Sequence, residues 1–143
     1  HKRKETGRGE LIDLALVDCT LSTLTNVAQY YLTAGTIAPR WGNAHSTIVP
    51  YEALPAADGW MIVAVGNDAQ FARFAALLGK KEWAGDARFA TNAARVENRA
   101  TLMPLIEALM KQKPVAHWTQ ALRDADIPGG PVNRVDQAFA MEQ

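Results

Sequence analysis

An Asp-Gly pair followed by an uninterrupted apolar run constrains the fold of this 143-residue chain more than any other feature. The pair is Asp58-Gly59, and the run covers residues 60–65. Asp-Gly tolerates positive φ angles, so it is typical of tight turns between antiparallel strands. Residues 48–54 can supply the partner strand, and Pro50 confines that strand to a sheet edge or a strand end. The sequence therefore predicts a β-hairpin with one buried strand.

Several helices are predicted around this hairpin. Residues 11–17 are predicted as a strand, with a helix as the alternative, and a helix then runs from Asp18 to a stop at Gly35. Residues 127–132 should form a rigid loop that enters a short strand. After the hairpin, apolar residues at helical spacing predict helices at residues 67–78, 91–112 (with a kink or restart at Pro104), 115–125 and 135–141. This order predicts a mixed α/β or α+β fold.

The composition excludes two classes of partner. Lys and Arg total 15, and Asp and Glu also total 15, so the chain lacks the broad positive field of a nucleic-acid binder. No apolar run is long enough to cross a bilayer, so we expect no membrane partner. The single cysteine, Cys19, excludes a disulfide within the chain and is predicted to be a small buried residue. These features predict a protein of a reducing, cytoplasmic compartment.

One loop carries most of the polar groups that could take part in chemistry. It runs from Trp41 to Thr47 and combines Gly and Asn with His45 and Ser46, which can donate hydrogen bonds. Such a loop can present backbone N–H groups to an oxyanion or a thioester carbonyl. The alternative is an interdomain loop in which Asn43 caps a turn, and the residues alone favour that alternative.

Polar residues outside this loop give weaker indications of a functional site. The three histidines lack Cys or His partners at metal-ligand spacing, so no metal site is predicted. Arg95 and Arg99 lie four residues apart and are predicted to form a solvated ion-pair face. Asp86 and Arg88 are predicted to pair locally, and Asp58 is explained by its turn.

Four segments, taken in order, resemble motifs of the family III (CaiB/BaiF) coenzyme A transferases. Each segment is weak evidence alone, but their order and spacing together are specific. The segments are Thr6-Gly7-Arg8-Gly9-Glu10 with residues 11–16; Gly42-Asn43-Ala44-His45 with Pro50-Tyr51 and Asp58-Gly59; Asp86-Ala87-Arg88-Phe89 with Asn92, Arg95, Asn98 and Arg99; and residues 127–132.

The resemblance implies a fold and a domain organisation. Such enzymes have a large Rossmann-like α/β domain and a smaller domain, and two chains interlock as a homodimer. On this basis we expect residues 1–37 to be the end of a large-domain segment with a linker helix. Residues 38–130 would form a small α/β domain with a β-hairpin and several helices, and residues 131–143 would begin the return to the large domain.

The resemblance also implies an activity. The family moves CoA from an acyl-CoA donor to a carboxylic acid through an aspartyl mixed anhydride, with no permanently bound cofactor. The nucleophilic aspartate lies upstream of the matched segments, so no catalytic residue is expected here and the chain alone is predicted to be inactive. Two alternatives remain open, an acyl-CoA racemase of the same family and a non-catalytic dimerisation module. The residues expected to face the substrate are Asn43, Ala44, His45, Ser46 (where the family usually has Pro) and Thr47.

Overall fold

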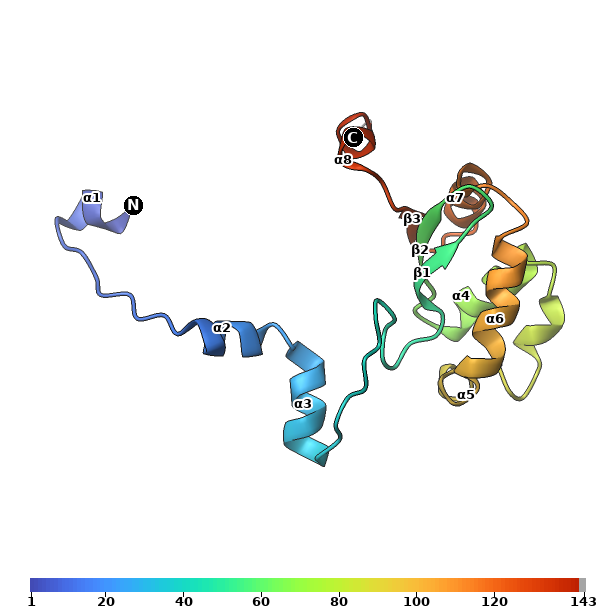
Figure 1. The fold of residues 1–143 in the computed structure, drawn as a ribbon, viewed down its shortest axis with the longest axis horizontal. Coiled ribbons are helices and arrows are strands. Elements are labelled where there is room, and N and C mark those ends of the chain that lie inside the picture. Colours follow the sequence, from blue (N-terminus) through green and yellow to red (C-terminus); the bar gives the residue numbers. More distant parts are fainter. Residues whose placement is uncertain (142–143) are drawn as a thin grey trace. The chain divides into compact units, whose positions relative to one another are not determined.

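A computed structural model describes residues 1–141 of the chain. It divides into two compact units, His1–Arg40 and a second unit that begins at Trp41. Figure 1 labels the helices and strands of both units. Among the helices of the described residues, none combines the length and the apolar character needed to cross a membrane.

The first unit contains three helices, α1 (Lys2–Thr6), α2 (Leu16–Ser22) and α3 (Thr25–Ala34). The strand predicted at residues 11–17 is wrong, because residues 11–15 have no regular structure and α2 begins at Leu16. A strand needs a neighbour to pair its backbone groups, and this unit offers none within the described residues. The single helix predicted from Asp18 is broken before Thr25, whose φ is 43°. Gly35 ends α3 in the left-handed conformation, as predicted.

Cys19 is also placed differently from the prediction. Its side chain is exposed on α2, although free cysteine is usually buried. The large apolar side chains of residues 11–17 are exposed in the same way. The first unit therefore has no apolar core of its own.

The predicted β-hairpin is confirmed. Strands β1 (Tyr51–Pro55) and β2 (Trp60–Ala64) pair antiparallel, with Leu54 opposite Met61. The short strand predicted in residues 127–132 is β3 (Gly129–Pro131), which pairs antiparallel with the other side of β2. The strand order is β1-β2-β3, so β1 lies at an edge, as Pro50 predicted.

The turn of the hairpin works differently from the prediction. Neither Asp58 nor Gly59 has a positive φ angle. Instead, the Asp58 carboxylate accepts a hydrogen bond of 2.7 Å from the backbone N–H of Val115. This contact satisfies a free N–H at the start of α7 (Val115–Asp124). Asp58 therefore joins the turn to a helix more than fifty residues away.

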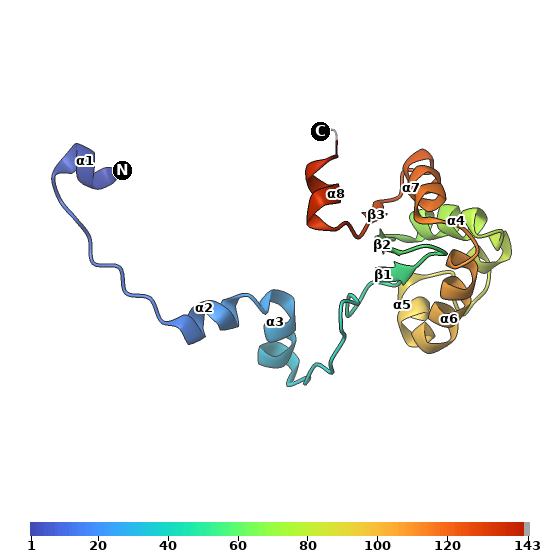
Figure 2. The same ribbon diagram turned by 45° about the horizontal axis from the view of Figure 1, so that its top comes forward.

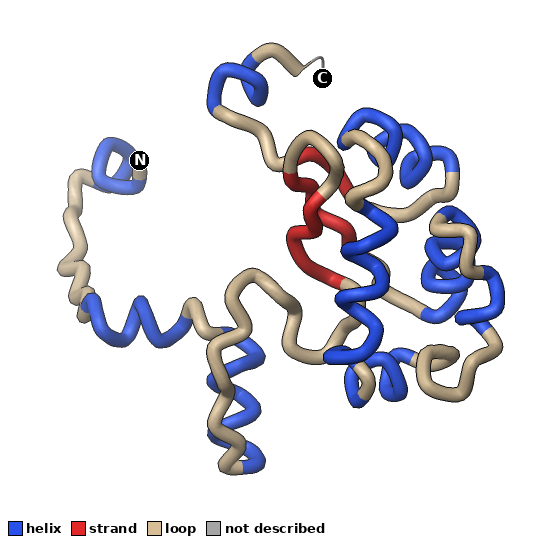
Figure 3. Tube along the Cα trace, turned by 45° about the vertical axis from the view of Figure 1, so that its right-hand side comes forward, coloured by secondary structure: helices blue, strands red, loops and turns tan. Residues whose placement is uncertain are grey.

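Helices cover one face of the sheet. In Figures 2 and 3, α4 (Asp68–Leu77), α6 (Arg99–Met110) and α7 lie to one side of the three strands. Met61 and Val63 point into this layer and are fully buried. Alternate residues of β2, Trp60 and Ile62, point the other way and are exposed. The core therefore lies between one sheet face and the helices.

The predicted helices after the hairpin are largely confirmed. Asn67 caps α4 by accepting a hydrogen bond from the N–H of Gln70. The helix predicted from residue 91 is two helices, α5 (Asn92–Glu97) and α6, and the break lies at Asn98. Pro104 stands inside α6, which continues past it. The remaining elements are the 3₁₀ helix η1 (Lys81–Ala84) and α8 (Val135–Phe139).

Candidate functional site

The candidate loop lies in the second unit and leads directly into β1. It opens with a turn in which the N–H of Ala44 donates to the carbonyl of Trp41, 3.1 Å away. Gly42 occupies the left-handed region of this turn with a φ of 63°. The side chain of Asn43 does not cap this turn, contrary to the alternative expectation. Its Oδ1 accepts a hydrogen bond of 2.8 Å from the N–H of Ala53 and ties the loop to the edge strand.

His45 is held by three contacts. Its N–H donates to the carbonyl of Tyr51 (2.9 Å), and its ring stacks on the Tyr51 ring with centroids 5.2 Å apart. Its Nδ1 accepts a hydrogen bond of 3.2 Å from the N–H of Thr47. A neutral imidazole has one donor and one acceptor, so Nε2 carries the proton. His45 is therefore an oriented donor next to the edge strand.

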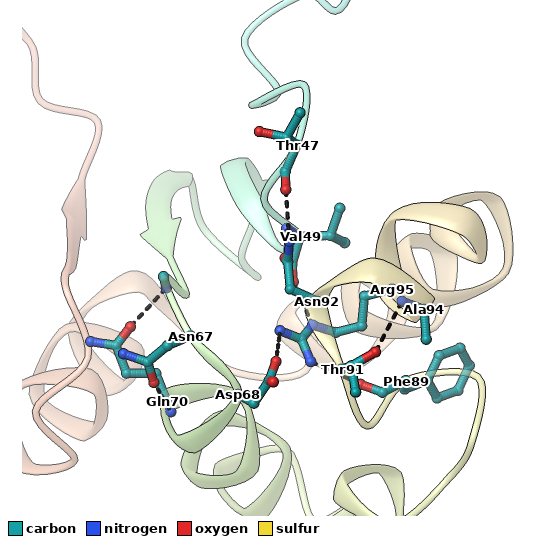
Figure 4. A network of polar contacts seen from close by, with 11 residues as sticks. Thr47, Val49, Asn67, Asp68, Gln70, Phe89, Thr91, Asn92, Ala94 and Arg95 are labelled. Carbon is teal, nitrogen blue, oxygen red and sulfur yellow. Dashed lines mark hydrogen bonds and ion pairs between the residues drawn. The ribbon is translucent and has the colours of Figure 1, made fainter.

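Asn92, the first residue of α5, holds the end of the loop by two hydrogen bonds. Its Nδ2 donates to the carbonyl of Thr47 (2.7 Å), and its Oδ1 accepts from the N–H of Val49 (3.1 Å). Figure 4 shows this side chain between the loop and the helix. One amide side chain thus pairs with a backbone carbonyl and a backbone N–H, as the backbone of a neighbouring strand would.

Arg95 lies deeper than Asn92 and is fully buried, with no exposed surface. Its Nε donates to the carbonyl of Val49 (2.7 Å) and its Nη1 to the carbonyl of Phe89 (2.9 Å). Its Nη2 reaches the carboxylate of Asp68 at 2.9 Å (Figure 4), and its guanidinium lies over the Phe71 ring. Burial lowers the pKa of Arg95, while the hydrogen bond to Asp68 opposes that shift. The predicted solvated ion-pair face is therefore wrong for Arg95.

Arg99 reaches the middle of the loop. Its Nη2 donates to the carbonyl of His45 (2.6 Å) and lies 3.3 Å from the carbonyl of Ser46. Its guanidinium also lies over the Trp41 ring, 4.9 Å from the centroid. The structure therefore places the predicted loop residues beside two helices that hold their carbonyl groups.

Glu52 on β1 forms an ion pair with Arg99 but no hydrogen bond. The Oε1 of Glu52 and the Nη1 of Arg99 are 3.7 Å apart, and neither atom has a hydrogen-bond partner within the described residues. Burial raises the pKa of Glu52, the charge of Arg99 lowers it, and Glu107 raises it again. The net shift is upward, so burial outweighs the attraction to Arg99.

This balance predicts that the difference in stability between Glu52→Gln and the wild type shifts in favour of the variant as the pH rises. A carboxyl group whose pKa is raised on folding binds its proton more tightly in the folded state. The folded state is then favoured below the unfolded pKa of about 4.5, and that advantage is lost as the pH rises through the folded pKa. The free energy of unfolding of Glu52→Gln relative to wild type should therefore increase between pH 4 and pH 8.

Urea unfolding followed by tryptophan fluorescence measures this difference, since all four tryptophans follow residue 40. Glu97→Gln, at an exposed position of α5, is the matched control and should show no comparable trend. A wild type that gains stability over Glu52→Gln with rising pH would show that the Arg99 contact outweighs burial.

Sequence reasoning missed Asn92, Arg95 and Arg99 as residues that hold the loop. All three belong to the motif quoted for the resemblance, and in the structure Asn92 and Arg95 lie on α5 while Arg99 begins α6. Their partners are backbone carbonyls more than forty residues earlier, which no local pattern shows.

Metal binding has no support in this part of the chain. Within residues 1–141, no group of three His, Cys, Asp or Glu side chains is arranged to hold a metal ion. His117 is exposed and lies edge-on to Trp118.

Comparisons with known proteins point to one family. The model of CoA-transferase family III matches residues 1–143. The chain is 36% identical over 142 residues to the succinyl-CoA:glutarate CoA-transferase of Mus musculus, covering 99% of this chain and 33% of the relative. It is 39% identical over 138 residues to the succinate–glutarate CoA-transferase of Agrobacterium fabrum, covering 96% of this chain and 34% of the relative.

A solved structure agrees with these relatives. A CaiB/BaiF family protein from Brucella suis is 46% identical and superposes with a TM-score of 0.78. The match covers 99% of this chain and 38% of that structure. The chain thus spans about a third of the length of the proteins that it matches.

Proposed function

The chain belongs to CoA-transferase family III, and from that premise we propose that the protein containing it transfers CoA from an acyl-CoA thioester to a carboxylic acid. The observation that carries this proposal is the family match over every residue of the chain. The two relatives described above are named as a succinyl-CoA:glutarate and a succinate–glutarate CoA-transferase. We therefore propose short dicarboxylic acids and their CoA esters as the substrate class.

The proposed reaction begins at an aspartate outside residues 1–143. Its carboxylate attacks the thioester carbonyl, the C–S bond breaks, and CoA leaves as a thiolate while a mixed anhydride forms. The thiolate then attacks the aspartyl carbonyl, releases the donor acid and leaves an aspartyl-CoA thioester. The acceptor carboxylate repeats these steps in reverse and departs as the new CoA ester.

Three aspartates of the second unit hold structural contacts. Asp58 caps α7, Asp68 binds Arg95, and Asp86 pairs with Arg88 at 2.6 Å, which holds the pKa of Asp86 down at about 2. None of them is a free carboxylate next to the candidate loop. This supports a nucleophile supplied by another part of the protein.

The candidate loop is proposed to face the reacting thioester. The Nε2–H of His45 and the backbone N–H groups of the loop are donors that can stabilise the oxyanion formed during each attack. The residues proposed to line this side of the site are Asn43, Ala44, His45, Ser46 and Thr47. The domain assignment expected from the sequence, with a small domain at residues 38–130, is part of the same proposal.

An interlocked homodimer is also part of the proposal. Apolar side chains of the first unit are exposed, among them Leu11, Ile12 and Leu16. A surface with many exposed apolar side chains usually contacts another protein surface. Analytical ultracentrifugation of the whole protein should give a dimer that does not dissociate on dilution, and a monomer would contradict this part.

The activity is tested by incubating the whole protein with succinyl-CoA and glutarate and measuring glutaryl-CoA by mass spectrometry. We expect transfer with the whole protein and none with the 143-residue chain alone. Loss of α-deuterium from a 2-methylacyl-CoA without any CoA transfer would instead indicate the racemase. If neither reaction occurs with a panel of CoA esters and acids, the proposed function is wrong.

A further inference from the structure

The direction of the backbone groups in the candidate loop is set from α5 and α6. Three consecutive carbonyls, those of His45, Ser46 and Thr47, face Arg99 or Asn92 at 2.6, 3.3 and 2.7 Å. In a trans peptide the C=O and the following N–H point in opposite directions. The N–H groups of the next three residues therefore point away from the helices.

Two of these three N–H groups remain available. The N–H of Thr47 donates to Nδ1 of His45. The N–H groups of Ser46 and Ile48 donate no hydrogen bond to any described residue. Two free N–H groups, two residues apart in one loop, are donors from which an anionic oxygen can accept hydrogen bonds.

We propose that Arg99 is a positioning residue, which turns the His45 and Ser46 carbonyls inward so that the Ser46 and Ile48 N–H groups face the substrate oxygen. This inference rests on the proposed function, because it assigns the loop to the transferase site. Arg99 acts only through the backbone and does not touch the substrate.

The groups around Arg99 hold its guanidinium in the position that this role requires. The planar group lies over the Trp41 ring while one nitrogen faces two carbonyls. Glu52, the neighbouring carboxylate, is 3.7 Å away and does not hydrogen-bond to it. A lysine ammonium lacks the planar fork and cannot stack and bind both carbonyls in the same way.

The kinetic test uses Arg99→Ala and Arg99→Lys in the whole protein, with Arg88→Ala as the matched control. Arg88 is an exposed arginine whose partner is Asp86, two residues away. Donors aimed at an oxyanion act mainly in the transition state, so kcat should fall about 100-fold in Arg99→Ala while KM changes little. Added guanidinium should restore part of the kcat of Arg99→Ala, and Arg88→Ala should match wild type.

A second readout does not depend on activity. Hydrogen exchange of the His45 and Thr47 N–H groups should be about tenfold faster in Arg99→Ala, while residues 60–78 keep wild-type exchange. This arm separates the two proposals: an inactive wild type with this exchange pattern refutes the proposed function and leaves the positioning of the loop by Arg99 in place.

Three results would overturn the assignment of Arg99. The first is wild-type kcat in both variants. The second is unchanged loop exchange in Arg99→Ala. The third is activity lost together with protection throughout residues 60–78 in both variants, without rescue by guanidinium, since that pattern means a purely structural role.

Discussion

Replacing Arg95 with alanine should lower the free energy of unfolding by about 3–5 kcal/mol. The guanidinium is fully buried and donates to the carbonyls of Val49 and Phe89 and to the carboxylate of Asp68. Alanine leaves two buried carbonyls without a donor and opens a cavity beside Phe71. Urea unfolding followed by tryptophan fluorescence measures the loss.

Arg88→Ala is the matched control for Arg95→Ala. Arg88 also binds a nearby aspartate, but its side chain is 58% exposed. Solvent screens an exposed ion pair so that it contributes little to stability, and this variant should remain close to wild type. Equal losses of stability in the two variants would show that burial does not determine how much Arg95 contributes to the free energy of unfolding.

Replacing Gly129 with alanine should lower the free energy of unfolding by about 1–3 kcal/mol. A Cβ atom at this position would lie 2.8 Å from the carbonyl oxygen of Ile62 and 2.8 Å from Cδ1 of Leu122. Leu122 can rotate, but the carbonyl belongs to the backbone of β2. The sheet must therefore shift where β2 and β3 pair.

Gly130→Ala, one residue further along β3, is the control for Gly129→Ala. A Cβ atom at Gly130 meets no atom within 4 Å, so the chain should lose little stability. Thermal unfolding of both variants gives the comparison. A Gly130→Ala variant that is less stable than Gly129→Ala would contradict the close packing of β3 against β2.

The hairpin and most helices could be predicted because their signals are local. The apolar run that forms β2 directly follows Asp58-Gly59 in the sequence. Asn67 caps α4 by accepting a hydrogen bond from the N–H of Gln70, three positions later. The strand predicted at residues 11–17 failed because a strand depends on a partner that the first unit does not contain within the described residues.

The loop residues could be proposed from the sequence, but the groups that hold them could not. Arg95 and Arg99 look like surface residues on a helix, since arginine is seldom buried. Their burial depends on the carbonyls of Val49 and His45, which chain folding brings from about fifty residues away. Such contacts between side chains and distant backbone leave no periodic signal.

Hydrogen exchange of the whole protein with and without succinyl-CoA tests whether residues 44–48 face the substrate. The N–H groups of Ser46 and Ile48 have no acceptor within the described residues, so they should exchange quickly without ligand. We predict that saturating succinyl-CoA slows exchange across residues 44–48 and leaves the turn at residues 56–59 unchanged. Bound succinyl-CoA that protects other segments and leaves residues 44–48 unchanged would contradict a substrate-facing loop.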